Sequence, residues 1–263
     1  MGSKHDILTE EELSEFSLSK NVKLCLQEFA DKYEPPLKPE QVNVLDWGCG
    51  RGRSVAKLLE KGYNVYGIDI ENKVLQNGYP LFEKRGLKPE NIIFHIDQLD
   101  KFEDNFFHVI FSEQVLEHVE DIHSMIHELA RLTAPGGIGI HQFPGKYNIN
   151  EGHLFMPFVH WLPKNNLRKS AIALLLAMGK GPKTRWPEAV GKKFWEVVDV
   201  YYTYLNQKTY YRDIKNICGL FHDNGFDVTY EITSNFLRKY CPVVLLRNGY
   251  PRGSINIFTR KNG

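Results

Sequence analysis

The chain has 263 residues, of which 42% are hydrophobic and 25% are charged. These proportions are typical of soluble globular proteins, and they exclude a disordered, collagenous or coiled-coil chain. At roughly 150 residues per domain, the length fits one large domain or a domain with a sizeable insertion. The longest apolar run, Ala171 to Met178, is far shorter than the roughly 20 residues that a membrane-spanning helix needs.

The cysteines and the start of the chain indicate a reducing environment. Met1 to Asp6 contain no apolar signal segment, and no two cysteines form a C-x-x-C pair. The cysteines are Cys25, Cys49, Cys218 and Cys241. We therefore expect a cytoplasmic protein with neither a disulfide framework nor a zinc site.

Charge is unevenly distributed, although the net charge is only +1. Residues 141–195 contain nine Lys or Arg and two acidic residues, a net charge of +7. Such a block indicates either a solvated face or an anionic partner, for example a phosphorylated substrate, a lipid surface or nucleic acid.

The first predicted element is a helix over residues 9–33, with Thr9 and Glu12 placed as a capping box. Pro35, Pro36 and Pro39 end it. Beyond these prolines, strand-like runs alternate with helix-like stretches, which predicts a mostly parallel sheet covered by helices. The predicted strands are 42–46, 64–69, 92–96, 108–112, 138–143, 226–232 and 254–258. The predicted helices are 53–61, 73–85, 122–133, 166–178, 192–205 and 209–223.

This rhythm divides the chain into four parts. We expect an N-terminal helical segment over residues 1–40 and a cofactor-binding core over 41–144. Residues 145–206 are rich in aromatic and basic residues and interrupt the strand pattern, so we interpret them as an insertion that covers the substrate. Residues 207–263 complete the core sheet.

A glycine-rich turn follows the first predicted strand. The segment Asp46 to Gly52 reads DWGCGRG and runs directly into a helix, so backbone N–H groups can approach a ligand closely. A dinucleotide fingerprint would need a third glycine at position 53, which is Arg53. Asp69 ends the second strand, where a carboxylate can accept hydrogen bonds from ribose hydroxyls. Asp97 and Gln98 follow the third strand beside the same crevice.

Together these motifs resemble the class I S-adenosylmethionine-dependent methyltransferases, over about residues 42–143. Residues 112–119, SEQVLEHV, are similar to the family's fourth motif, which lies beneath the transferred methyl group, and Pro135 to Gly137 resemble the turn before its fifth strand. The resemblance implies a Rossmann-like α/β fold. Its seven-stranded, mostly parallel sheet would carry helices on both faces and an α-helical lid insertion after strand five. It also implies S-adenosyl-L-methionine as cofactor and S-adenosyl-L-homocysteine as product.

The resemblance further implies a role for each cofactor residue. Asp46, Gly48 and Gly50 would line the methionine part, Asp69 would hold the ribose, and Asp97 with Gln98 would meet the adenine. The expected cofactor site is completed by Cys49, Ile70, Ser112 and Glu113.

The acceptor must lie after strands four and five, in line with the methyl group at about 3–3.5 Å. A hydroxyl acceptor also needs a base, and histidine suits that task near neutral pH. His153 is the first candidate for a base or acceptor-orienting residue, followed by Tyr147 and His160, and His118 after strand four is another. The stretch is similar to a subgroup of bacterial methyltransferases with E-P-H and H-W-L-P elements, although Gly152 stands where that subgroup often has proline.

A subset of relatives binds a divalent metal through a Glu-x-x-Glu-His arrangement after strand four. Here Gln114 occupies the first Glu position, and a neutral amide is a poor ligand. We therefore predict no metal, and we expect Glu117 and His118 to hydrogen-bond and shape the pocket.

These observations favour a methyltransferase that modifies an oxygen of a small molecule or saccharide. The basic insertion suggests a phosphorylated or nucleotide-linked acceptor. One alternative is a lipid or quinone-like acceptor at a membrane surface. Residues 167–180 would then rest on that surface. Another is a cofactor-binding scaffold without catalysis. A nucleic-acid substrate is disfavoured, because strand four lacks an Asn-Pro-Pro-Tyr or Asp-Pro-Pro-Tyr element. The oligomeric state stays open.

Overall fold

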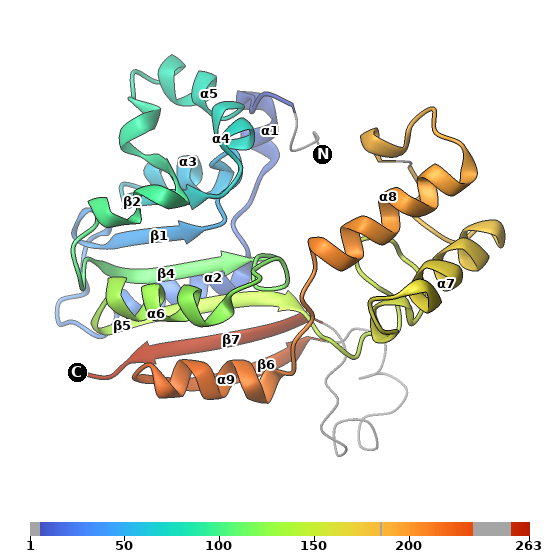
Figure 1. Cartoon of the computed structure of the whole chain (residues 1–263). Helices are drawn as coiled ribbons and strands as arrows, with labels where there is room; N and C mark the ends of the chain where they lie inside the picture. The colour runs from blue at the N-terminus through green and yellow to red at the C-terminus, as the bar shows by residue number, and fades with distance from the viewer. Residues whose placement is uncertain (1–5, 185, 234–253) are drawn as a thin grey trace.

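A computed structural model describes residues 6–184, 186–233 and 254–263 (Figure 1). The strands are β1 Asn43–Trp47, β2 Asn64–Asp69, β3 Ile93–His95, β4 Phe107–Glu113, β5 Thr133–Pro144, β6 Phe226–Thr233 and β7 Ser254–Lys261. The α-helices are α1 Glu10–Glu15, α2 Lys20–Ala30, α3 Arg53–Leu59, α4 Asn72–Gln76, α5 Tyr79–Lys84, α6 Ile122–Leu132, α7 Asn166–Ala177, α8 Phe194–Gln207 and α9 Ile214–Asp223. Short 3₁₀ helices are η1 Pro39–Gln41, η2 Pro89–Asn91, η3 Ile96–Lys101, η4 Val159–Trp161 and η5 Pro187–Ala189. Arg185 and Cys241 lie outside the described residues. Within those ranges, no helix has the length and apolar character to cross a membrane.

All seven strands join one sheet in the order β3-β2-β1-β4-β5-β7-β6. Strands β1 to β5 run parallel to one another, whereas β7 is antiparallel to both of its neighbours, β5 and β6. The predicted seven-stranded, mostly parallel sheet is therefore confirmed. The order reverses between β1 and β4, and in such sheets ligands bind beyond the carboxyl ends of the strands at this switch point.

Helices cover both faces of the sheet, as predicted (Figure 1). Alternate residues of a strand point to opposite faces, so Val44 packs with the side chains of α1 to α5, whereas Leu45 packs with those of α6 and α9. Both residues are fully buried. The sheet therefore holds a separate apolar core on each face, which fixes the strand ends that carry the site.

The insertion has an apolar core of its own, built from α7, α8 and the loops beside them. Figure 1 shows α7 and α8 standing beyond the carboxyl ends of β1 and β4. The buried guanidinium of Arg168 ties the two helices together, because it donates to the carbonyls of Leu162 and Leu205. A rigid helical pair is thus held over the end of the sheet where ligands bind.

The single helix predicted over residues 9–33 is wrong, because the chain breaks it into α1 and α2. Ser19 starts α2 by accepting a hydrogen bond from the amide of Val22. Thr9 caps α1 as predicted, but the Glu12 carboxylate binds Arg51 at 2.6 Å instead of closing the capping box. The N-terminal segment is thereby tied to the glycine-rich turn.

Several element boundaries differ from the prediction, and three of these differences lie near the candidate site. The helix over 73–85 is interrupted at Gly78, where a Cβ atom would lie 2.1 Å from the Arg51 carbonyl oxygen. Residues 135–137 form an irregular part of β5 rather than a turn before it, since the pairing with β4 shifts register there. Helix α9 begins at Ile214, and the residues before it hold the candidate site, as described next.

Candidate active site

The glycine-rich turn lies against the ends of two neighbouring strands. The amides of Gly48 and Cys49 both donate to the Ile68 carbonyl, at 2.8 and 2.9 Å. Gly48 has a φ of 85°, and a Cβ atom there would lie 2.3 Å from a methyl carbon of Val115. Only glycine fits this position, and the segment that follows β4 therefore lies directly over the turn.

Acidic side chains gather at the carboxyl ends of β1, β2 and β4. Asp46 is buried, and burial together with the nearby charges of Glu113 and Asp69 raises its pKa well above the usual range. The Asp69 carboxylate accepts hydrogen bonds from the amides of Gly50 and Glu71, each at 2.9 Å. A positively charged ligand would relieve the repulsion among these carboxylates, and the sulfonium and ammonium groups of S-adenosylmethionine carry such charge.

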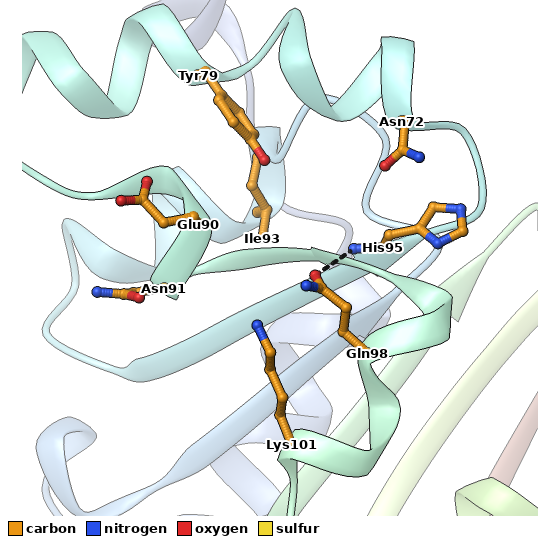
Figure 2. Close-up of a pocket in the computed structure, with 8 residues that line it drawn as sticks. All are labelled: Asn72, Tyr79, Glu90, Asn91, Ile93, His95, Gln98 and Lys101. Carbon is orange, nitrogen blue, oxygen red and sulfur yellow. Dashed lines mark hydrogen bonds between the residues drawn. The ribbon is translucent and has the colours of Figure 1, made fainter.

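The residues predicted to meet the adenine lie at the edge of this region. Ile70 is 70% exposed although it follows a buried strand. Gln98 lines a pocket of about 460 Å³ between α4, α5 and β3, and its side chain accepts from the His95 amide (Figure 2). The Asp97 side chain is 83% exposed and lies 3.1 Å from His95 Nδ1. Gln98 therefore lines this pocket, and the Asp97 carboxylate next to it in the chain is open to solvent.

Two other predicted cofactor residues face inward. The Ser112 hydroxyl is fully buried and lies 2.8 Å from His141 Nδ1. Burial raises the pKa of the Cys49 thiol well above its usual range. Neither side chain therefore presents a charged group to a ligand.

The segment after β4 is anchored by the residues between α8 and α9. The Tyr210 amide donates to the Glu117 carbonyl at 2.7 Å. Arg212 donates to the carbonyls of Leu116 and Val119 at 3.3 and 2.7 Å. These bonds hold the polypeptide that carries Glu117 and His118 in a fixed position.

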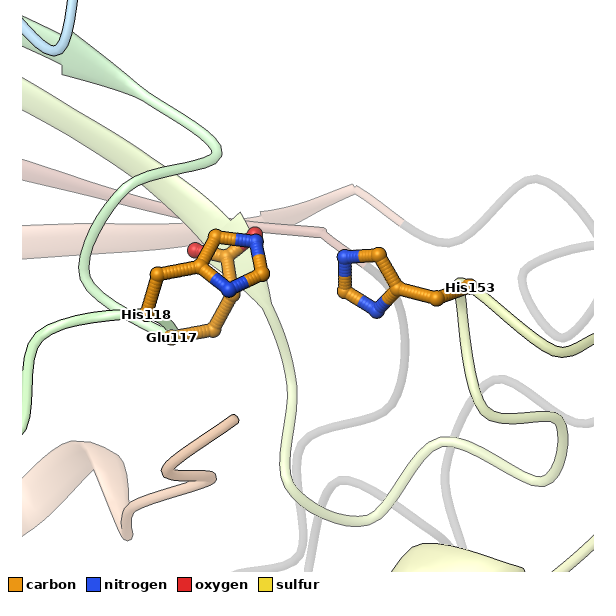
Figure 3. A group of neighbouring side chains, drawn as sticks. All are labelled: Glu117, His118 and His153. Atoms are coloured by element: carbon orange, nitrogen blue, oxygen red, sulfur yellow. The ribbon is translucent and has the colours of Figure 1, made fainter. Parts of the chain in front are cut away.

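Three side chains converge beyond that segment (Figure 3). Glu117, His118 and His153 each offer one potential ligand atom, and these atoms lie within 4.8 Å of one another. Glu117 is 2% exposed, and neither of its carboxylate oxygens has a hydrogen-bond partner among the described residues. Burial raises its pKa to about 7. The predicted candidates His118 and His153 are thus brought together around a carboxylate that we had expected only to shape the pocket.

The orientation of both imidazoles is fixed by their Nδ1 atoms. His118 Nδ1 lies 2.6 Å from the Lys208 carbonyl oxygen, and His153 Nδ1 lies 2.7 Å from Glu151 Oε1. A carbonyl or an ionised carboxylate can only accept, so Nδ1 carries the proton in each ring. The neutral tautomer then has its lone pair on Nε2.

Glu151 is a buried carboxylate that holds neighbouring groups in place. It belongs to the Glu151-Gly152-His153 motif, in which the sequence alone predicted a role only for His153. It accepts from the amides of His153 and Leu154, from His153 Nδ1 and from the Tyr211 hydroxyl. Burial would raise its pKa, but the hydrogen bond and charge of His153 and the bond from Tyr211 outweigh burial and lower it. Glu151 is therefore ionised and holds His153 in place.

Aromatic rings from α8 and its flanks close the group. Tyr204 lies 5.3 Å from His153 and 4.7 Å from Trp186, measured between ring centroids. Burial and the charges of Glu151, Glu117 and Glu71 raise the Tyr204 pKa. Since Glu71 follows β2, helix α8 reaches across the crevice toward the predicted ribose side.

The two remaining candidates stand outside this group. The Tyr147 hydroxyl donates to Asp213 at 3.1 Å. His160 is buried with its ring 4.9 Å from Tyr211, and burial lowers its pKa to about 4. Tyr204 and Tyr211 were not predicted, because no local motif marks aromatic residues that reach the site from helix α8 and the stretch that follows it.

Comparison with known proteins identifies the domain. Residues 45–140 match the family model described as "Methyltransferase domain". A ubiquinone biosynthesis O-methyltransferase of Rickettsia typhi is 29% identical over 130 residues, which are 48% of this chain and 51% of that protein. The chain thus spans about half the length of the curated relatives it matches.

Solved structures agree with the fold along nearly the whole chain. A methyltransferase of Methanosarcina mazei superposes with a TM-score of 0.55 at 18% identity, covering 94% of this chain and 99% of that one. A phosphoethanolamine N-methyltransferase of Haemonchus contortus, solved with S-adenosyl-L-methionine, gives 0.53 at 16% identity, covering 93% and 53%. The family model covers the ends of β1, β2 and β4, which carry the glycine-rich turn and the carboxylates. Residues 45–140 are therefore a methyltransferase domain, and the fold of the chain is that of the class I S-adenosylmethionine-dependent methyltransferases.

Proposed function

We propose that this protein transfers a methyl group from S-adenosylmethionine to an oxygen atom of a small-molecule or saccharide acceptor. One observation carries the proposal: Val115 packs on Gly48, and two residues later Glu117 meets His118 and His153. A crevice suited to the cofactor and a polar group suited to an acceptor therefore adjoin. Among the described residues, Cys25, Cys49 and Cys218 form no disulfide, which supports a reducing compartment such as the cytoplasm.

At the cofactor end, the proposal assigns Asp69 to the ribose and Asp46 to the methionine part. Asp69 is already held by two backbone amides, so its carboxylate needs no rearrangement to receive hydroxyl donors. Gln98 and the exposed Ile70 then border the adenine.

At the acceptor end, His153 orients the acceptor hydroxyl within the group of Glu117 and His118. The bond from acceptor oxygen to carbon forms while the bond from carbon to sulfur breaks, S-adenosylhomocysteine leaves, and the hydroxyl proton passes to the lone pair of His153 Nε2. Tyr204 and Trp186 cover the reacting atoms, which excludes water and strengthens the electrostatic interactions inside.

The charge of the insertion supports an anionic acceptor. Lys180, Lys183, Lys192 and Lys193 are exposed around α7 and α8. A phosphorylated or nucleotide-linked acceptor would be attracted to these side chains by long-range electrostatic steering.

A second candidate is a lipid or quinone-like acceptor, and one observation favours it. Apolar side chains of the same insertion are unusually exposed: Leu174 63%, Met178 63%, Val190 65% and Trp195 64%. Apolar side chains with lysines beside them suit contact with an anionic membrane surface. The name of the Rickettsia typhi relative points to a quinone pathway.

The test is transfer of labelled methyl from S-adenosylmethionine into a cell extract that is then separated into aqueous, organic and nucleic-acid fractions. Label in the aqueous fraction supports the small-molecule or saccharide acceptor, and label in the organic fraction supports the second candidate. Absence of label from every fraction, with cofactor binding intact by calorimetry, would contradict both and leave a cofactor-binding scaffold.

His153→Ala sharpens that test. Loss of an acceptor-orienting group should lower turnover by about 10²- to 10⁴-fold, while cofactor affinity stays within about twofold. His222→Ala is the matched control, because the His222 side chain is 79% exposed on α9. Full activity of the His153 variant would remove this residue from the reaction.

A further inference from the structure

We propose that Glu117, His118 and His153 form a binding site for a divalent transition-metal ion of the Zn²⁺ class. The proposal concerns the acceptor end of the same site, and the role of the ion in catalysis rests on the proposed methyl transfer. Binding of the ion does not rest on it.

The donor set fits such an ion in chemistry and spacing. Two imidazoles and one carboxylate present atoms within 4.8 Å of one another, and Figure 3 shows the His118 and His153 rings facing each other beside the Glu117 carboxylate. Zinc binds this combination, leaving a fourth position for water or substrate. A cation at the centre would touch all three groups.

The buried carboxylate is the strongest single indication. Both oxygens of Glu117 are buried, and neither has a hydrogen-bond partner among the described residues. An unpartnered carboxylate costs free energy unless an opposite charge compensates it. No Lys or Arg forms an ion pair with Glu117 in the described part of the chain, whereas a bound cation would compensate it.

The surroundings of the imidazoles are those of metal ligands. A metal-bound histidine nearly always donates its other ring N–H to a carboxylate or a backbone carbonyl, which fixes the tautomer and orients the ring. His153 has Glu151 in this position and His118 has the Lys208 carbonyl. Glu151 is therefore a positioning residue, since it acts on the ion through His153.

The same donors discriminate between ions. Imidazole suits Zn²⁺ and its neighbours in the first transition row, whereas Mg²⁺ and Ca²⁺ prefer sites made of oxygen atoms. Only one of the three donors is a carboxylate, that of Glu117. We therefore expect Zn²⁺ and Co²⁺ to bind far more tightly than Mg²⁺.

The ion would leave at least one position for the acceptor oxygen. A hydroxyl bound to a divalent ion loses its proton to water more readily, so the oxygen attacks the methyl carbon as an anion. Tyr204 and Trp186 would then enclose the ion together with the bound acceptor.

The experiment measures binding of Zn²⁺ and Co²⁺ to the full chain, stripped with a chelator and free of any polyhistidine tag. Calorimetry should give one ion per chain, and Co²⁺ should give the visible absorption of a nitrogen-ligated site. Millimolar Mg²⁺ should not displace either ion. No binding, or displacement by Mg²⁺, would overturn the proposal.

Variants assign the ion to these residues. Glu117→Gln, His118→Ala and His153→Ala should each weaken binding at least 100-fold, and Glu151→Gln about 10- to 100-fold. The control His222→Ala should bind like the natural chain, because its side chain is exposed on α9. Cofactor affinity, measured in each variant, reports whether the domain is folded. Unchanged ion binding in the three ligand variants would contradict the assignment.

Activity separates this inference from the proposed function. Transfer that stops with a chelator and returns with Zn²⁺ or Co²⁺ supports a catalytic ion. Transfer that persists after complete stripping overturns the catalytic role while the methyltransferase proposal stands. Ion binding without transfer into any fraction leaves the site intact and counts against the methyl transfer.

Discussion

The two halves of the candidate site are assembled in different ways. The cofactor half consists of Asp46, Gly48, Asp69 and Glu113, which lie at or just beyond the ends of adjacent parallel strands. The acceptor half consists of Glu117, His118, Glu151 and His153, which come from two loops and depend on residues around α8 for their positions. The cofactor half follows from the sheet, whereas the acceptor half forms only when the insertion docks. Substitutions in one half should therefore leave the other half nearly unchanged.

The largest effect is expected for Asp69→Ala on cofactor binding. The variant loses an acceptor for the ribose hydroxyls and also releases the amides of Gly50 and Glu71. Hydrogen bonds to a charged group contribute about 1.5–3 kcal/mol each, so the dissociation constant should rise by about 100-fold or more. Calorimetry with S-adenosylmethionine measures it.

Asp223→Ala is the matched control for this prediction, because the Asp223 side chain is 76% exposed at the end of α9. Its removal should change cofactor affinity by no more than about threefold, because exposed charges interact weakly. Equal losses in the two variants would contradict the assignment of the ribose to Asp69, and loss of Zn²⁺ binding in either would contradict the independence of the halves.

The contrast also explains what could be predicted from the sequence. Asp46 and Asp69 end predicted strands and Gly48 follows one of them, and a parallel sheet brings the carboxyl ends of its strands to one edge, so the local pattern predicts that these residues lie together. The grouping of Glu117, His118 and His153 was not predicted, because Gln114 departs from the metal-binding motif of relatives and His153 meets Glu117 only through the fold. Glu151 was visible in the same motif as His153, but its burial and its contact with Tyr211 depend on residues between α8 and α9. Tyr147 and His160 have suitable polar side chains and lie in the predicted stretch after β5. Packing nevertheless places them outside the group of Glu117, His118 and His153.

Glu117→Gln tests the acceptor half through stability. Burial raises the pKa of Glu117 from 4.5 to about 7, so the folded metal-free protein holds a proton that the unfolded chain releases. The resulting stabilisation is fully present below pH 4.5 and is lost as the pH rises through 7. The shift corresponds to about 3 kcal/mol, so the variant should be more stable than the natural chain by up to that amount at pH 8.

Urea unfolding at pH 5 and pH 8, with a chelator present, measures the difference. The two proteins should have similar stability at pH 5, where Glu117 is protonated, and should differ at pH 8. A variant that is less stable at pH 8 would show that the ionised carboxylate has a compensating partner in the protein itself, which would remove the main reason for a cation. Asp97→Gln is the control, because the Asp97 side chain is 83% exposed to solvent.

The smallest effect on methyl transfer is expected for His160→Phe, which compares two histidines of the same loop. His153 belongs to the converging group, whereas His160 is buried against Tyr211 outside it. Phenylalanine keeps the ring packing, so turnover should change by no more than about threefold. A loss comparable to that of His153→Ala would place His160 in the acceptor half after all.

The same variant should behave differently in acid. Burial lowers the pKa of His160 from 6.5 to about 4, so the folded protein binds this proton less well than the unfolded chain does. Its contribution to stability is present above pH 6.5 and is lost as the pH falls toward 4, in the direction opposite to that of Glu117. His160→Phe should therefore lose less stability than the natural chain between pH 7 and pH 5 in urea unfolding. Equal losses would mean that His160 becomes protonated within the folded protein near its ordinary pKa, and that the layer behind Tyr211 is open to water.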